Sequence, residues 1–464
     1  MNIAEEIFKR TQPQSLAVIS RDRVISYRDL NKKSAEIAEM LRREMKGPGI
    51  KRIGLLGPDS PDYISIALGI LRAEGCLVPL APTLSTRERS ELTAETALDA
   101  VIVTDRNGGF LIERSPPATP PIWLEPLNAM EPAFIRFSSG TTGEAKGIVL
   151  SHRTLVERVK AANTNLGITS TDRILWVLPM SHHFAASIML YLWHGAAIIL
   201  PDSHLAEDML GAAVKAGASI VYAAPFHFEL LANCRDPTWP SLRLAVSTTA
   251  ALSVETGKKF AAIYGIHPAQ ALGIIEVGIP CLNTADPAGC PESVGRPQPP
   301  FKIEVRVSNA RLAQPADQGE LYVRGPGMLD AYISPWQVQS QVLDADGWFA
   351  TGDIATIDHN GFVTLRGRLR SMINVGGMKF FPEEVESILT SHPAISGARL
   401  IGRAHPDFGM VPVAEVTVAH GSTAPRVSEL LALCRRELSR YKTPAEISIV
   451  DKIPLTPTGK VRRT

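Results

Sequence analysis

A segment rich in glycine and hydroxyl side chains carries the clearest chemistry in this chain. It runs from Phe137 to Gly147 and reads F-S-S-G-T-T-G-E-A-K-G. Glycine lets backbone N–H groups turn toward an anion, while Thr141, Thr142 and Lys146 add donors and positive charge. The residue types therefore predict a phosphate-binding loop, although such a segment taken alone can also be an ordinary turn.

The spacing differs from that of a Walker loop. In that motif, G-x-x-x-x-G-K-[ST], the lysine follows a glycine and precedes a hydroxyl residue that holds magnesium. Here Lys146 follows Ala145 and precedes Gly147. We therefore do not expect a kinase-type P-loop.

The composition indicates a globular protein whose partner is a small molecule. The chain has 464 residues, enough for two or three domains. Its 48 Lys and Arg residues balance 47 Asp and Glu residues. The net charge therefore creates no strong electrostatic field that would favour binding to nucleic acid or to an anionic membrane. The five cysteines have neither zinc spacing nor the even count of a disulfide framework: Cys76, Cys234, Cys281, Cys290 and Cys434.

Two segments bear on location. The N-terminus, M-N-I-A-E-E-I-F-K-R, carries acids where a targeting peptide would be basic, so we expect a cytoplasmic protein. The stretch 174–201 contains no Asp, Glu, Lys or Arg, which raises the question of a membrane span. Pro179, several histidines and Gly195 interrupt it, so we predict a buried helix followed by a buried strand and no membrane span.

Short apolar runs alternate with helical patterns through much of the chain. This alternation predicts βαβ units and a mainly parallel sheet covered by helices on both faces. The expected strands are 53–56, 76–80, 100–104, 219–223 and 242–247, and a helix is expected over 27–43. Between Glu292 and Phe362, Gly, Pro and Asp punctuate strands expected over 302–307, 320–323 and 347–351, as in a small barrel-like subdomain.

The pattern of the sequence changes again at Gly367, where charged residues and glycines are mixed. Pro382 followed by two glutamates predicts the first turn of a helix. Further strands are expected over 398–401 and 414–418, with a helix over 427–440. The last part of the chain is therefore predicted to be a compact α+β domain.

The loop and several later motifs together resemble those of the adenylate-forming superfamily, which includes acyl-CoA synthetases, aryl-acid ligases, luciferases and the adenylation domains of peptide synthetases. The likeness extends from I-S-Y-R-D-L at Ile25 to the terminal T-P-T-G-K-V-R-R. It implies that ATP and Mg²⁺ activate a small carboxylic acid to an acyl adenylate, from which the acyl group passes to a thiol. It also implies an α/β fold: a large N-terminal lobe, residues 1–367, of parallel α/β subdomains plus a small barrel-like subdomain, then a small mobile α+β lobe, residues 368–464.

The resemblance assigns the nucleotide site residue by residue. Glu276 in A-L-G-I-I-E would hold Mg²⁺ against the phosphates, since this hard ion prefers oxygen ligands. Asp353 in F-A-T-G-D and Arg368 in G-R-L-R would contact the ribose. The other implied nucleotide contacts are Ser138, Ser139, Gly140, Thr141, Thr142, Gly143, Lys146, Thr249, Ala250, Leu272 and Gly273.

The largest departures from the family pattern occur at two positions. Leu272 stands where an aromatic ring normally stacks on adenine, and Ile275 where a threonine normally reaches the α-phosphate. A hydrogen bond to a charged group is worth about 1.5–3 kcal/mol. Either another donor covers the phosphate, or the enzyme is slow, or its nucleotide sits differently.

Lys460 in P-L-T-P-T-G-K is the expected centre of the adenylation chemistry. A lysine on a glycine-containing terminal loop would bridge the substrate carboxylate and the α-phosphate while charge redistributes in the transition state. Arg370 would be the hinge of the mobile lobe. The catalytic groups that the resemblance implies are thus Lys460, Glu276, His182 and Thr141.

His182 in P-M-S-H-H-F-A-A lies where the family places a histidine or an aromatic residue beside the acyl pocket. The other implied pocket residues are Phe184, Ala185, Thr248, Ile274 and Ile275. Relatives that activate α-amino acids have an aspartate shortly after this histidine region. The segment 180–192 contains none, so we expect an unsubstituted or aromatic acid.

The sequence leaves the acceptor thiol open between coenzyme A and the phosphopantetheine arm of a carrier protein. Gly376, Gly377 and Lys379 would line the thiol tunnel, which serves both acceptors. A second hypothesis is a catalytically weak protein that binds a nucleotide or acyl adenylate without turnover, for which Leu272 and Ile275 are the best support. A membrane transporter, which rests on the uncharged stretch alone, is the weakest alternative.

Overall fold

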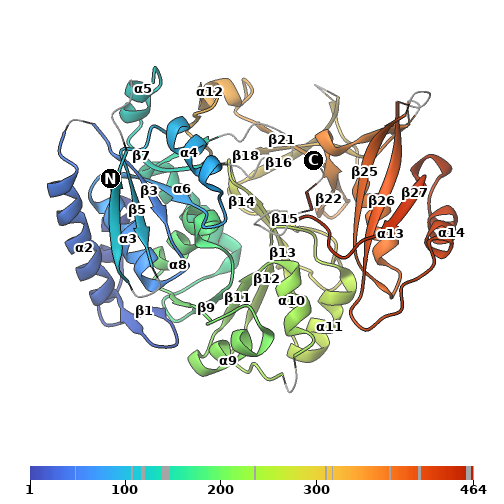
Figure 1. Cartoon of the computed structure of the whole chain (residues 1–464), viewed down its shortest axis with the longest axis horizontal. Coiled ribbons are helices and arrows are strands. Elements are labelled where there is room, and N and C mark those ends of the chain that lie inside the picture. Colours follow the sequence, from blue (N-terminus) through green and yellow to red (C-terminus); the bar gives the residue numbers. More distant parts are fainter. Residues whose placement is uncertain are drawn as a thin grey trace. The chain divides into compact units, whose positions relative to one another are not determined.

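The computed structural model describes the chain apart from residues 48, 106–107, 116–120, 138–146, 235–236, 309–310, 316, 376–377, 406–408, 456–460 and 463–464, and apart from the side chains of residues 308, 311, 370, 379 and 409. The chain divides into two compact units (Figure 1). Unit 1 comprises Met1–Ser138, Ala145–Lys302 and Val323–Phe349, and unit 2 comprises Ser139–Glu144, Ile303–Tyr322 and Ala350–Thr464. The lobe boundary expected between residues 367 and 368 stays a prediction.

Unit 1 contains an eight-stranded sheet with a parallel centre. Strand β3 pairs in parallel with β4 and β5, and β4 pairs in parallel with β7. The hairpin of β7 and β8 is antiparallel and flanks the predicted phosphate loop. In spatial order the strands are β20 (Gln337–Val338), β19 (Ala331–Tyr332), β8 (Gly147–Ser151), β7 (Pro132–Phe137), β4 (Cys76–Leu80), β3 (Arg52–Leu56), β5 (Ala100–Thr104) and β6 (Phe110–Arg114).

A nine-stranded sheet forms the rest of the unit's framework. Its six central strands pair in parallel and are, in spatial order, β13, β12, β11, β9, β10 and β1. Its edge strands β2, β14 and β15 pair antiparallel with their neighbours. In spatial order the strands are β15 (Arg296–Pro297), β14 (Gly278–Leu282), β13 (Ala269–Ile274), β12 (Leu244–Ser247), β11 (Ile220–Ala223), β9 (Arg173–Trp176), β10 (Ala197–Ile199), β1 (Leu16–Ile19) and β2 (Val24–Ser26).

The helices of unit 1 begin at recognisable caps. Ser26 accepts the N–H of Asp29 in a capping box before α2, and Ser60 with Pro61 opens α3. The helices are α1 (Ile3–Arg10), α2 (Tyr27–Glu44), α3 (Pro61–Arg72), α4 (Thr86–Glu95), α5 (Leu124–Ala129), α6 (His152–Leu166), α7 (Met180–His183), the π-helix η1 (Phe184–Ile188), α8 (Met189–Trp193), α9 (Ala206–Ala216), α10 (Pro225–Leu231), α11 (Val254–Tyr264) and α12 (Gln339–Val342).

One hydrophobic core lies between the two sheets and a second lies behind the nine-stranded sheet. Alternate residues of β9 enter the two cores: Ile174 and Trp176 face the first, and Leu175 faces the second. The second core is covered by α9, α10 and α11, drawn in green in Figure 1. Burial on both faces explains why these strands read as continuous apolar runs in the sequence.

Unit 2 contains two further sheets. One has the order β17 (Arg311–Leu312), β16 (Lys302–Ser308), β18 (Gly319–Arg324), β21 (Phe349–Ile357) and β22 (Val363–Arg368). The other comprises β24 (Met378–Phe380), β23 (Ile373–Val375), β26 (Gly409–Val418) and β25 (Ile395–His405), with β27 (Glu446–Ile449) paired in parallel to β26. Its helices are η2 (Leu369–Ser371), α13 (Pro382–Thr390), α14 (Val427–Glu437) and η3 (Arg440–Lys442).

The expected elements are present, and most of their ends shift by one to three residues. Three strands are clearly longer than expected: 347–351 corresponds to β21, 398–401 to β25 and 414–418 to β26. Strands β4 and β5 match the predicted bounds, α2 extends one residue further, and α14 ends at Glu437 where the sequence suggested residue 440. The uncharged stretch 174–201 forms β9, α7, η1, α8 and β10. Within the described ranges, no helix is both long enough and apolar enough to cross a membrane.

Candidate active site

Three residues form a row across neighbouring strands of the eight-stranded sheet. Arg136 of β7 pairs with Ile148 of β8, and Ile148 pairs with Tyr332 of β19. Paired residues share a face of a sheet, and the alternation along β7 puts Arg136 on the face of Phe134, which lies in the core between the two sheets. With strands about 4.8 Å apart, the backbones of Arg136 and Tyr332 are separated by roughly 10 Å.

Glu276 joins one end of this row. It lies in the turn between β13 and β14, and its Oε1 accepts a hydrogen bond of 3.0 Å from the Tyr332 hydroxyl. Its carbonyl oxygen accepts the N–H of Leu329 at 2.7 Å. Burial, with the Glu276 charge as a smaller cause, raises the pKa of Tyr332, so this hydroxyl remains a donor. The carboxylate is therefore fixed in place while one of its oxygens keeps capacity for a further ligand.

Arg158 of α6 braces the same turn. Its Nε donates to the Gly327 carbonyl at 2.5 Å and its Nη1 to the Ile275 carbonyl at 2.6 Å. Burial lowers the pKa of Arg158 to about 10, an effect that the charges of Glu276 and Asp330 oppose. The guanidinium therefore stays charged at neutral pH and supports the backbone just before Glu276.

His182 lies at the other end of the row. It belongs to α7, which follows β9, and the Asp59 side chain holds the start of that helix by accepting the N–H of Met180 at 2.9 Å. The next residues form the π-helix η1, a distortion that frequently occurs at functional sites. The neighbouring His183 packs its ring edge-on against Trp176, with centroids 5.9 Å apart.

His182 and Arg136 contact each other directly. The Arg136 Nη2 lies 3.4 Å from the His182 Nδ1. Burial, helped by the Arg136 charge, lowers the pKa of His182 to about 4, so the imidazole is neutral at pH 7. Burial also lowers the pKa of Arg136 to about 10, against the opposing effect of Glu276, so the guanidinium stays charged. The predicted acyl-pocket histidine therefore has a permanent cation beside it.

The other predicted pocket residues lie at the ends of strands and helices in unit 1. Phe184, Ala185 and Ile274 are buried, and Thr248 is buried directly after β12. Thr249 has φ +76°, an unfavourable region for a β-branched residue and one that occurs at functional sites. Its buried Oγ1 has no partner within the described part of the chain.

The two largest departures from the family pattern, Leu272 and Ile275, occupy different surroundings. Leu272 is only 6% exposed, and Gly273 beside it is exposed. A Cβ at Gly273 would lie 3.7 Å from the Thr248 Oγ1, so β13 and the end of β12 approach closely there. Ile275 is half-buried, and its carbonyl is occupied by Arg158.

Unit 2 brings the two predicted ribose residues together. Asp353 of β21 and Arg368 of β22 are register partners, and their Oδ1 and Nε atoms lie 2.6 Å apart. Arg368 also donates from Nη1 to the Thr351 carbonyl at 3.2 Å, and the Thr351 hydroxyl accepts the N–H of Asp353 at 3.0 Å. Asp353 is 5% exposed, whereas the Arg368 side chain is 48% exposed, so the pair presents a buried acceptor beside a donor that solvent reaches.

Several predicted residues lie outside the described part of the chain. They are Ser138, Ser139, Gly140, Thr141, Thr142, Gly143, Lys146, Gly376, Gly377 and Lys460, together with the side chains of Arg370 and Lys379. Their proposed roles therefore stay predictions. Ala250 is described and exposed.

Sequence reasoning missed Arg136, Arg158, Tyr332 and Asp59. A signal was present for Arg136, because the strand P-A-F-I-R-F places a charge within an otherwise apolar run next to the glycine-rich segment. Arg158 and Tyr332 gave no such signal, since their contacts depend on the pairing of distant segments.

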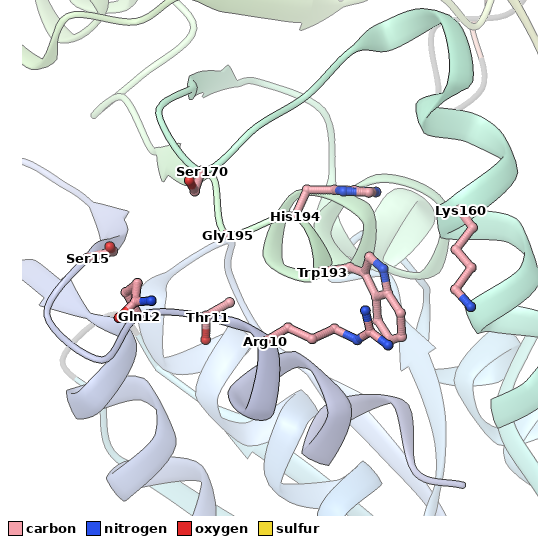
Figure 2. A pocket seen from close by; sticks show the side chains of 9 residues that line it. All are labelled: Arg10, Thr11, Gln12, Ser15, Lys160, Ser170, Trp193, His194 and Gly195. Atoms are coloured by element: carbon pink, nitrogen blue, oxygen red, sulfur yellow. The ribbon is translucent and has the colours of Figure 1, made fainter.

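A separate pocket of about 500 Å³ lies among α1, α6 and the end of α8 (Figure 2). Figure 2 shows the Arg10 side chain running along the Trp193 ring, and their Cζ and centroid are 4.4 Å apart. The Lys160 Nζ lies 5.8 Å from the same ring centroid. None of the predicted site residues lines this pocket, so it is distinct from the candidate active site.

Comparison with known proteins places these features in a family context. A sequence profile described as AMP-binding enzyme matches residues 6–333, and the AMP-binding enzyme C-terminal domain matches residues 384–460. The chain is 27% identical over 480 residues to a feruloyl-CoA synthase of Amycolatopsis sp, an alignment that covers 97% of this chain and 95% of the relative.

Solved structures share the fold. ATP-bound MatB from Rhodopseudomonas palustris has a TM-score of 0.87 at 22% identity, covering 99% of this chain and 97% of that one. An o-succinylbenzoate CoA synthetase from Bacillus subtilis, in complex with its acyl-adenylate intermediate, has a TM-score of 0.85 at 22% identity, covering 100% and 97%. These likenesses confirm the expected α/β fold class.

The profile of AMP-binding enzymes spans more than half of the chain, and the C-terminal profile follows it in the expected order. The chain therefore belongs to the AMP-binding enzyme family, the adenylate-forming superfamily.

Proposed function

We propose that the protein is an ATP-dependent carboxylic acid–thiol ligase that forms an acyl adenylate and then a thioester with coenzyme A. The observation that carries this proposal is one row across a sheet in a chain of the AMP-binding family. The row holds the Glu276–Tyr332 pair at one end and the Arg136–His182 pair at the other. A metal-binding carboxylate and an acyl-pocket histidine would thus be held at a fixed separation, as the joining of a nucleotide to an acid requires.

ATP is the nucleotide that the family and the ATP-bound structure of similar fold support. The proposal that Mg²⁺ takes part is based on Glu276, because carboxylate oxygen is the ligand type that this ion prefers. Within the described ranges, no group of three or more His, Cys, Asp and Glu side chains could hold a metal. Glu276 would therefore supply a single carboxylate to a site completed by phosphate oxygens and water, which is common for Mg²⁺.

The proposed reaction has two steps. An oxygen of the acid attacks the α-phosphorus of ATP, the bond to the bridging oxygen breaks, and pyrophosphate leaves. The thiol sulfur then attacks the acyl carbon, AMP leaves with the bonding electrons, and the thiol proton passes to solvent. Asp353 and Arg368 would hold the ribose, and Lys460 would neutralise charge where the carboxylate meets the α-phosphate.

Coenzyme A is the favoured acceptor because sequence relatives such as the feruloyl-CoA synthase are named for it. The decisive experiment supplies the enzyme, ATP and a responsive acid with either coenzyme A or a phosphopantetheinylated carrier protein, and detects thioesters by mass spectrometry. We expect the coenzyme A thioester. A thioester on the carrier alone would show that the acceptor is wrong, and adenylate without either thioester would contradict the ligase activity.

Lys460 gives a test that separates the two steps. Lys460→Ala should slow adenylate formation about 10²–10³-fold, the range for loss of one preorganised electrostatic group. Supplying a synthetic acyl adenylate should bypass the defect and leave thioester formation near the parent rate. Normal adenylate formation in this variant, or an equal loss in both steps, would exclude Lys460 as the adenylation lysine.

A further inference from the structure

The contact between Arg136 and His182 fixes the protonation pattern of the histidine. A guanidinium has donors and no acceptor, so Arg136 donates and the His182 Nδ1 accepts across their 3.4 Å contact. In a neutral imidazole, the nitrogen that accepts carries no proton, and the other nitrogen carries it. His182 is therefore held as the tautomer with its proton on Nε2.

Among the described residues, that proton has no acceptor. The His182 Nε2 is buried and has no hydrogen-bond partner within the described part of the chain, and the same holds for the Arg136 Nε. A buried donor without a partner is destabilising by about 1–3 kcal/mol, so native proteins rarely keep one without a reason. Two such donors on adjoining side chains are therefore available to an acceptor from outside the described part of the chain.

The charge of Arg136 supports the same conclusion. Among the described residues, no carboxylate lies within ion-pair distance of its guanidinium, and the nearest acidic influence on it is that of Glu276. Glu276 is already engaged by Tyr332 at the other end of the row. The position lies in a strand whose other inward residue, Phe134, is fully apolar, so packing alone does not call for an arginine there.

We propose that Arg136 is the positioning residue of His182, and that the two side chains together bind a carboxylate-type oxygen of the acid substrate. The proposal rests on the proposed acid-activating function and extends it to residues of strand β7. Arg136 holds the ring and supplies positive charge, while the His182 Nε2–H donates to the substrate oxygen. That oxygen belongs either to the reacting carboxylate or to a second anionic group of the acid.

The direct test of the pairing needs no turnover. Nitrogen NMR of the ¹⁵N-histidine-labelled protein, with the His182 signals assigned by comparison with His182→Gln, reports which ring nitrogen carries the proton. We expect Nε2–H in the parent protein and a mixture of tautomers in Arg136→Met, which keeps a long apolar side chain but has no donor. An Nδ1–H tautomer in the parent would overturn the proposal.

The kinetic test uses three variants. Arg136→Met should raise the KM for the acid about 10–100-fold, the range for loss of a hydrogen bond to a charged group, with a much smaller change in the KM for ATP. Arg136→Lys should bring the KM for the acid part of the way back to the parental value, because lysine restores the positive charge but not the planar set of guanidinium N–H donors. Lys160→Met, which removes an exposed cation of the same unit, should leave both constants at the parent values.

Matched acids distinguish the two sources of the substrate oxygen. The KM is measured for each monocarboxylic acid and for its analogue with a second carboxylate, in the parent and in Arg136→Met. If Arg136→Met raises the KM for both acids, Arg136 and His182 bind the reacting carboxylate. If it raises the KM only for the dicarboxylic acid, they bind the second carboxylate. An unchanged KM for both acids, in a variant with parental thermal stability, would overturn the proposal.

The outcome also separates this inference from the proposed function. If the parent protein shows no acid-dependent activity, the ligase proposal fails, and the NMR experiment still tests the pairing of Arg136 with His182. If the parent is active but Arg136→Met retains the parental KM for every acid, the inference fails and the ligase proposal stands.

Discussion

At the scale of single residues, the site combines matches to the family pattern with compensations of its own. Glu276 is present and is supported by the Tyr332 hydroxyl and by the brace from Arg158 to the preceding carbonyl. Ile275 cannot donate to a phosphate, yet its carbonyl serves that brace. The turn before β14 is therefore organised to present one carboxylate, and the brace acts through the Ile275 backbone, independently of its side chain.

Glu276→Gln tests the role of that carboxylate. The amide keeps the size of the side chain and can still accept from Tyr332, but it lacks the charge that attracts Mg²⁺. We expect adenylate formation to fall about 10²-fold or more and the Mg²⁺ concentration for half-maximal rate to rise. Tyr332→Phe, which removes only the supporting hydroxyl, should have a clearly smaller effect. Equal effects of the two substitutions, with an unchanged Mg²⁺ dependence, would contradict metal binding at Glu276.

At the scale of elements, the sequence was sufficient for the regular structure but not for the contacts between segments. Apolar runs such as 76–80 and 100–104 predicted β4 and β5 because burial on both faces leaves a clear pattern. The row from Arg136 to Tyr332 could not be predicted, since it depends on the antiparallel pairing of β8 with β19, which is far along the chain. The short helix α7 and the π-helix after it also gave no periodic signal.

Asp59 provides a test of how α7 is held. The Met180 N–H donates to its Oδ1, and α7 has no side-chain cap from its own N-cap residue, Pro179. Asp59→Ala should therefore lower the free energy of unfolding by about 1 kcal/mol, as loss of a cap does, and should weaken acid binding through His182. Asp59→Asn, which keeps an acceptor oxygen, should remain near the parent in chemical denaturation. Parental stability and acid binding in Asp59→Ala would show that this cap does not position α7.

At the scale of the whole molecule, buried histidines connect folding to pH. Burial lowers the pKa of His227 from 6.5 to about 3, with the His204 charge as a further cause, and lowers those of His152 and His182 to about 4. A base whose pKa is lower in the folded state binds fewer protons there, so acid favours unfolding. Desolvation raises the pKa of Asp59 to about 6, which acts in the opposite direction below that pH.

The free energy of unfolding should therefore fall as the pH drops from about 6.5 toward 4. His227 is 1% exposed and should contribute about 1.4 kcal/mol per pH unit over this range. Urea denaturation of the parent and of His227→Gln between pH 7 and pH 5 measures the contribution as a difference in slope. Equal slopes, or a steeper slope in the variant than in the parent, would contradict a neutral, buried His227.

If this chain transfers the AMP portion of ATP to a carboxylic acid with release of pyrophosphate, the most direct measurement is acid-dependent exchange of labelled pyrophosphate into ATP. The assay uses a panel of aliphatic, aromatic, dicarboxylic and amino acids with Mg²⁺, and Lys460→Ala as the matched inactive control. We predict that at least one acid raises exchange well above the acid-free rate in the parent, that chelation of Mg²⁺ abolishes it, and that the variant loses it. Exchange that no acid raises above background, in a folded protein that still binds ATP, would contradict the claim and favour a nucleotide-binding protein without turnover.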